Sequence, residues 1–195
     1  QTCAAIRAGH SDEQGRCLRG QREFTARRGI SRSSAGTITS NTWQMTLADT
    51  NTWRDHLLAS PDAIHRALTA VKTIAVVGIK PAETKAPAHY VPAYAQAAGF
   101  TIIPVPVYYP QMQSELGEQA YQSLGALPGP VDCVLLFRRP ADIPGHLDEI
   151  LDARPRLVWM QLGISHPEVA EALAKAGIDV VQDHCMLVEL KKMGR

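Results

Sequence analysis

The sequence predicts an α/β fold of the Rossmann-like, doubly wound kind, with a mainly parallel five-stranded sheet and helices on both faces. Two observations lead to this class. Five short apolar runs recur along the chain, and stretches of ten to fifteen residues with helical features separate most of them. This alternation of strand and helix is typical of parallel strands joined by right-handed crossovers, whose helices cover both faces of the sheet.

The first helix is expected directly after residue 60. Residues 60–62 read Ser-Pro-Asp, which combines a capping side chain, a proline suited to the first helical position and an acid in the first turn. Apolar side chains then follow at spacings of four and three, at Ile64, Leu68 and Val71. This spacing gives the helix one apolar face. The first strand is expected over 73–77 and stops at Gly78.

Glycine and proline mark the ends of the later helices. Helices are expected over 88–98, from Pro140 to about residue 153, and over 166–176, followed by a helical tail at the C-terminus. Gly99 and Gly177 each follow a helix at the position where a left-handed backbone ends it. Further strands are expected over 100–105, 131–137, 157–161 and 178–181. Prolines and glycines interrupt 106–130, which is therefore predicted to be irregular.

Residues 1–44 differ in pattern from residues 45–195. The first segment shows no lasting periodicity, contains the low-complexity stretch ARRGISRSSAGTITSN, and carries seven Arg and three acidic residues. We expect a disordered leader, tag or mistranslated flank, with the true start near Met45. An organelle transit peptide is the alternative. Residues 45–195 are expected to form one domain.

Composition argues against several classes of protein. Residues 45–195 carry thirteen basic and sixteen acidic residues, so a non-specific nucleic-acid binder is not expected. No apolar run approaches the roughly 18 residues of a membrane helix. The four cysteines form no CxxC pair, which predicts a reducing, cytoplasmic setting without a disulfide framework. The histidines form no i, i+4 pair with another histidine or with a cysteine, so no metal site is expected.

Ligands of doubly wound sheets bind at the carboxyl ends of the strands, so the loop that begins at Gly78 is the first candidate. It has one glycine in place of GxGxxG, and no acidic residue ends the second strand. A classical NAD or FAD enzyme is therefore not expected, and the GxxxxGK[ST] pattern of a P-loop is also missing.

Basic residues gather at these strand ends. Lys80, Lys85 and His89 lie within ten residues beside a predicted helix start, and Arg138 and Arg139 follow the third main strand. Cations and helix N–H groups together suit a ligand with several phosphates. A loop of solvated lysines is the alternative.

Four stretches carry a resemblance to a known family: IAVVGIKPAETKAPAHYVPAY, PVDCVLLFRRP, RPRLVWMQLGISHPEVAEALAKAGIDVV and DHCMLVEL. They cover about residues 70–190. In these stretches the chain resembles the small, stand-alone CoA-binding proteins, whose Rossmann-like domain is related to the CoA-binding domain of succinyl-CoA synthetase α subunits. The resemblance implies coenzyme A as the ligand.

The resemblance also implies which residues contact CoA. The loop 78–85 would hold the pyrophosphate, the turns after the second and third main strands would flank the adenosine and its 3′-phosphate, and the turn after the fourth would face the pantetheine. The implied residues are Gly78, Ile79, Lys80, Lys85, His89, Tyr90, Val105, Pro106, Phe137, Arg138, Gln161 and Gly163. The family commonly has Val-Asn-Pro after the second strand, and the absence of that Asn here removes a polar contact of about 0.5–1.5 kcal/mol.

Cys185 is the residue that could make the protein an enzyme. It follows the last strand beside His184, near the thiol end that the resemblance implies for CoA. A thiolate there could attack a thioester or form a mixed disulfide with CoA. A buried cysteine that packs the start of the tail is the alternative.

We therefore expect a module that binds CoA or a short acyl-CoA for sensing or carriage, without catalysis. Two alternatives stay open. One is an acyl-CoA or CoA-disulfide enzyme that uses Cys185, and the other is a nucleotide-binding regulatory subunit of a separate enzyme. The expected protein partners are a second copy of the chain or that enzyme, with no nucleic acid and no membrane.

Overall fold

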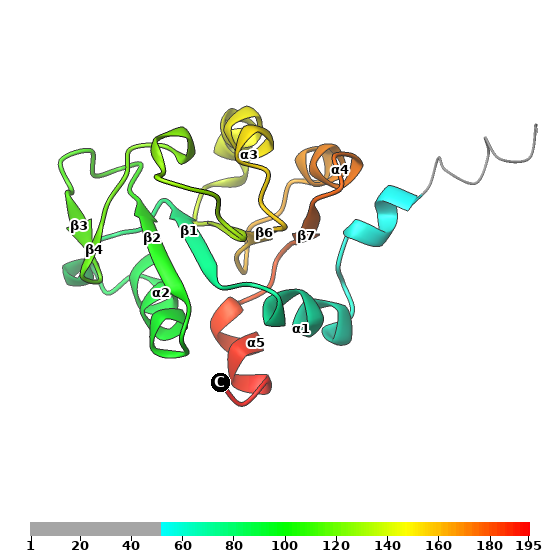
Figure 1. Ribbon diagram of the computed structural model, residues 1–195, viewed down its shortest axis with the longest axis horizontal. Helices are drawn as coiled ribbons and strands as arrows, with labels where there is room; N and C mark the ends of the chain where they lie inside the picture. The colour runs from blue at the N-terminus through cyan, green and yellow to red at the C-terminus, as the bar shows by residue number, and fades with distance from the viewer. Residues whose placement is uncertain (1–51) are drawn as a thin grey trace, which may run out of the picture. The chain divides into compact units, whose positions relative to one another are not determined.

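A computed structural model describes residues 52–195, whose centre is a five-stranded parallel sheet (Figure 1). The predictions for residues 1–44, and for a start near Met45, lie outside the described residues. The strands are β1 (Thr73–Val77), β2 (Thr101–Val105), β5 (Cys133–Leu136), β6 (Leu157–Met160) and β7 (Asp179–Val181). Their order is β2-β1-β5-β6-β7, and every neighbouring pair is parallel. The chain reverses its winding direction between β1 and β5, so the doubly wound prediction is confirmed.

Helices cover both faces of the sheet, as predicted. Figure 1 shows α1 (Pro61–Thr69), α2 (Pro87–Ala97) and α5 (Met186–Lys192) on one face, and α3 (Leu147–Ala153) and α4 (Pro167–Lys175) on the other. Side chains alternate across a strand, so neighbouring residues enter different halves of the core. Val76 packs in the cluster that contains α1, α2 and α5, whereas Val77 packs in the cluster that contains α3 and α4.

The predicted caps of α1 and α4 are present. Ser60 Oγ accepts a hydrogen bond of 3.3 Å from the Ala63 N–H, and Pro61 takes the first helical position. Gly177 follows α4 with a φ of +79°, a left-handed conformation that ends the helix without steric cost. These local signals fix where the connecting helices begin and end, and thereby which loops reach the carboxyl edge of the sheet.

Two predicted segments differ from the structure. The helix predicted over 140–153 is wrong in its first half, because the 3-10 helix η4 (Pro140–His146) precedes α3. Pro144 within η4 has no N–H to donate and its ring obstructs an α-helical turn. The stretch 106–130 is also not wholly irregular. It contains the antiparallel pair β3 (Ser114–Glu115) and β4 (Glu118–Gln119), and the short 3-10 helix η3 (Leu124–Ala126).

Asp132 ties together the amino ends of β1 and β5. Its carboxylate accepts hydrogen bonds of 2.9 Å and 3.0 Å from the backbone N–H groups of Lys72 and Thr73. Burial favours the neutral acid, but these hydrogen bonds outweigh it and hold the pKa of Asp132 below its ordinary value. A cavity lies at the opposite, carboxyl edge of the sheet. Within residues 52–195, no helix is both long and apolar enough to span a membrane.

Candidate functional site

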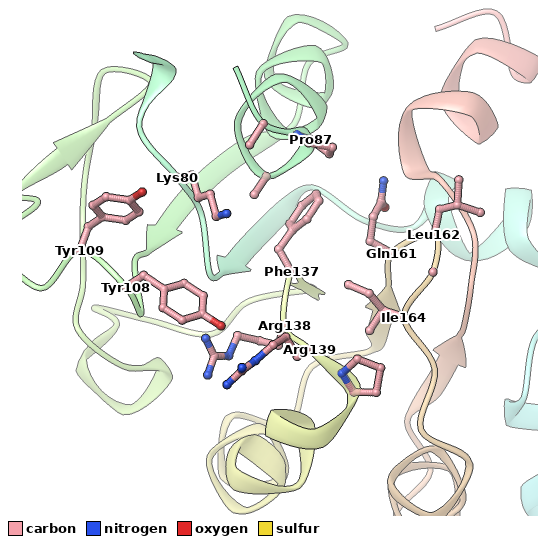
Figure 2. A pocket seen from close by; sticks show the side chains of 14 residues that line it. Lys80, Pro87, Tyr108, Tyr109, Phe137, Arg138, Arg139, Gln161, Leu162 and Ile164 are labelled. Carbon is pink, nitrogen blue, oxygen red and sulfur yellow. The ribbon is translucent and has the colours of Figure 1, made fainter. Parts of the chain in front are cut away.

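A cavity of about 710 Å³ opens at the carboxyl edge of the sheet, beside the point where the winding direction reverses (Figure 2). Its walls come from the segments that follow β1, β2, β5 and β6. The lining residues are Lys80, Ala86, Pro87, Ala88, Tyr108, Tyr109, Phe137, Arg138, Arg139, Pro140, Gln161, Leu162, Gly163 and Ile164. Four separate strand ends thus meet around one space, in the place where this fold class binds its ligands.

Gly78 lets the ends of β1 and β5 come together beneath the cavity. Its φ is +88°, and a Cβ atom on it would lie 2.5 Å from the carbonyl oxygen of Phe137. The backbone is fixed on both sides, because the Gly78 N–H donates to the Val105 oxygen and the Phe137 N–H donates to the Val77 oxygen. Only glycine fits this crossing.

Arg138 lies on the cationic side of the cavity, under the ring of Tyr108 (Figure 2). Its guanidinium carbon is 4.5 Å from the ring centroid, and its side chain is only 10% exposed. Nε donates to His146 at 3.0 Å, and Nη2 lies 3.4 Å from an oxygen of Asp142. Nη1 is buried and has no hydrogen-bond partner among the described residues. Such a group costs about 1–3 kcal/mol, which a ligand acceptor could recover.

Arg139 and Asp142 form the outer rim of this side. Arg139 Nε and Nη2 donate to the two carboxylate oxygens of Asp142 at 2.9 Å and 3.1 Å, although the arginine side chain is 76% exposed. The hydrogen bond from Arg139 holds the pKa of Asp142 below its ordinary value. Asp142 therefore stays ionised and offsets part of the positive charge at the rim.

Lys80 and the start of α2 supply a second set of donors. The Lys80 side chain points into the cavity in Figure 2, and its ammonium has no ion-pair partner in the part of the chain that the structure describes. Ala86 precedes α2 and offers no side-chain cap, and the first turn carries no acidic residue. Pro87 has no N–H, and the N–H groups of His89 and Tyr90 donate to the Ala86 oxygen. The Ala88 N–H, which has no acceptor among the described residues, is therefore the backbone group open to an anion, and the helix dipole favours one there.

The opposite wall is apolar. Figure 2 shows Gln161, Leu162 and Ile164 across the cavity from the arginines. Gln161 is 4% exposed, its oxygen accepts from the Met186 N–H at 3.2 Å, and its nitrogen donates to Cys185 Sγ at 3.4 Å. Cys185 therefore lies behind Gln161 and does not line the cavity. Leu162, by contrast, is 65% exposed and presents a bare apolar surface to a ligand.

The structure brings some of the predicted site residues to the cavity and not others. Lys80, Phe137, Arg138, Gln161 and Gly163 line it, while Gly78, Ile79, Val105 and Pro106 are buried beneath it. Three residues lie elsewhere. Lys85 is exposed at the end of the 3-10 helix η2 (Ala82–Thr84), Tyr90 is 49% exposed, and His89 Nε2 pairs at 3.2 Å with Glu115 of β3.

Sequence reasoning missed two tyrosines and much of the apolar wall. Tyr108 and Tyr109 follow β2 by three and four residues, so the rule that ligands bind at strand ends could have included them. Leu162 and Ile164 flank Gly163, which was predicted. They are single apolar residues on either side of a glycine with a positive φ, and no pattern in the sequence marks them as cavity residues.

Cys133 has no reactive role in this geometry. It is fully buried in β5, and burial raises the pKa of its thiol far above the ordinary value. Within residues 52–195, no group of three or more His, Cys, Asp or Glu side chains is placed to hold a metal ion.

Comparisons with known proteins agree with this architecture. The family described as the CoA binding domain matches residues 72–191. A Bacillus subtilis protein, YneT, is 36% identical over 127 residues, which cover 64% of this chain and 90% of YneT. The solved structure of a Thermus thermophilus protein, cell-free ID.343, is 43% identical with a TM-score of 0.63, and the match covers 69% of this chain and 99% of that one.

A hypothetical protein from Pyrococcus horikoshii is 26% identical with a TM-score of 0.64, over 70% of this chain and 94% of its own. The matches to these relatives span nearly the whole of each relative. The family match covers every strand of the sheet and all four segments that line the cavity. This chain belongs to the CoA binding domain family.

Proposed function

We propose that the protein binds coenzyme A or a short acyl-CoA in the cavity at the carboxyl edge of the sheet, as a binding module for sensing or carriage. The observation that carries this proposal is the division of the cavity into a cationic side and an apolar side. CoA is divided in the same way, with phosphates and adenosine at one end and pantetheine at the other. Membership of the family supports the choice of CoA over other phosphate ligands.

The two sides suggest how the ligand lies. The donors for phosphate oxygens are Lys80, the open N–H of Ala88 at the start of α2, and the unpaired Nη1 of Arg138. Leu162 and Ile164 offer an apolar path for the pantetheine arm. Nη1 is shielded from water, so a phosphate that reaches it must shift a neighbouring side chain. Tyr108, which is 46% exposed and covers the guanidinium, is the side chain that would shift, and it would release its hydrogen bond of 3.4 Å to Asp142.

The enzymatic alternative depends on Cys185, and it would require Gln161 to move aside. Cys185 Sγ contacts Gln161, whose side chain lines the cavity, so the thiol is separated from a bound ligand by one side chain. In the binding module, Cys185 and Gln161 instead support the wall. The described cysteines, Cys133 and Cys185, are free thiols, which fits a cytoplasmic protein.

Calorimetric titration of the full chain with CoA tests the proposal, with ATP and NAD as comparison ligands at matched salt. We expect CoA to bind more tightly than either. Lys80→Ala should weaken CoA at least about tenfold, since a hydrogen bond to a charged group is worth about 1.5–3 kcal/mol. Lys85→Ala is the matched control from the same loop and should change affinity less than about twofold, because that side chain does not line the cavity.

If Lys80→Ala and Lys85→Ala lose CoA affinity equally, the lysines act through general electrostatic attraction, and the proposed contact of Lys80 with the ligand is wrong. Absence of binding by the unaltered protein would refute the proposed function.

A further inference from the structure

Arg138 is held by a chain of hydrogen bonds that leads away from the cavity. Its Nε lies 3.0 Å from His146 Nε2, and His146 Nδ1 contacts an oxygen of Glu149 on α3. The other oxygen of Glu149 accepts a hydrogen bond of 3.2 Å from the backbone N–H of Leu124 in η3. The His146 side chain is only 13% exposed, so water competes little for these contacts.

Only one arrangement of protons satisfies this chain. Arginine remains charged and Nε can only donate, so His146 Nε2 must accept and carry no proton. Nδ1 then carries the proton and donates it to Glu149, which accepts as a carboxylate. A doubly protonated His146 would direct an N–H at the N–H of Arg138 and place two positive charges 3.0 Å apart. The contact therefore selects a neutral imidazole with its proton on Nδ1.

The same contacts leave Arg138 with one orientation. Nε is committed to His146, Nη2 lies beside Asp142, and Tyr108 covers one face of the guanidinium. Nη1 is the group left without a partner in the described chain. The charged and titratable groups that face His146 and Arg138 are Glu149 on α3, Asp142 on η4 and Tyr108 after β2.

We propose that His146 is a positioning residue for the phosphate-binding arginine, and that CoA affinity falls when His146 takes up a proton. This inference rests on the proposed CoA site. Protonation breaks the bond to Nε and repels the guanidinium, so Nη1 is no longer held for a ligand phosphate. By linkage, bound CoA favours the neutral imidazole to the same extent.

Titration of CoA at about pH 8 and at about pH 5.5 tests this, since imidazoles change charge between those values. The matched variant is His146→Gln, whose amide can accept from Arg138 and donate to Glu149 but does not titrate. At pH 8 we expect the variant to match the unaltered protein within about twofold. At pH 5.5 the unaltered protein should lose more CoA affinity than His146→Gln, by a margin larger than the about twofold agreement expected at pH 8, because only the histidine can place a second positive charge beside Arg138.

The ligand phosphates and the other histidines titrate in the same way in both proteins. The comparison with His146→Gln therefore isolates the effect of His146 on CoA affinity. Parallel pH profiles for the two proteins would overturn the inference while leaving the CoA site intact. Failure of the unaltered protein to bind CoA at pH 8 would instead overturn the proposed function.

A measurement without substitution covers the case in which the variant does not fold. Nitrogen NMR of the imidazoles at about pH 8 distinguishes the two neutral tautomers. We expect His146 with its proton on Nδ1, and a His146 protonated on Nε2 would contradict the positioning contact whether or not CoA binds.

Discussion

Gly78→Ala should destabilise the protein strongly, because two separate costs act at one position. A side chain at a φ of +88° costs about 1 kcal/mol. The added Cβ would also lie 2.5 Å from the Phe137 carbonyl oxygen, and the hydrogen bond from the Phe137 N–H to Val77 prevents that strand from retreating. Overpacking of this kind costs about 2 kcal/mol. The expected loss is about 3 kcal/mol, or about 9 °C in Tm at about 3 °C per kcal/mol.

Urea denaturation and thermal unfolding of the full chain measure this loss. Gly177→Ala is the matched control, because Gly177 has a φ of +79° but no atom within 4 Å of the position of its Cβ. It carries the backbone cost alone, about 1 kcal/mol. If Gly78→Ala and Gly177→Ala are equally destabilised, the close approach of β1 and β5 beneath the cavity is refuted.

Two further predictions concern Asp132 and Cys185. Asp132→Asn should lower stability at neutral pH by about 1–3 kcal/mol, because the carboxylate accepts the N–H groups of Lys72 and Thr73. The pKa of Asp132 is lowered in the folded state, so its contribution is present above about pH 4 and is lost as pH falls further. The unfolding free energy of Asp132→Asn should therefore fall less than that of the unaltered protein as the pH drops from about 5 to about 2. Urea denaturation at several pH values measures this, and an equal fall in the two proteins would contradict the prediction. Cys185→Ser should leave CoA affinity within about twofold, since Gln161 separates the thiol from the cavity. An acyl-CoA turnover in the unaltered protein that disappears in Cys185→Ser would contradict the binding-module proposal.

The sheet and the edge that carries the site could be predicted from sequence because their signals are local. An apolar run that ends in Gly78, and glycines after α2 and α4, mark where strands and helices stop. The alternation of strand and helix then fixes which strand ends face the same way. Lys80, Arg138 and Gln161 could be placed near one another for that reason alone.

The contacts within the site depend on segments without a periodic signal. His89 and Lys80 look equivalent in the sequence, yet the pair β3–β4 places Glu115 against His89, whereas Lys80 lines the cavity. The contact of Arg138 with His146 depends on the 3-10 geometry of η4, in which Pro144 has no N–H to donate. Side-chain pairs that depend on such irregular segments leave no spacing that a sequence pattern could reveal.

The most direct measurement of the central claim is a map of amide chemical-shift changes on addition of CoA to the full chain. We predict that the largest changes fall around the cavity, at Lys80, Ala88, Arg138 and Gly163. Changes confined to the second hollow beside β3 and β4, around Gln113, or no changes at all at saturating CoA, would contradict a CoA site at the carboxyl edge of the sheet.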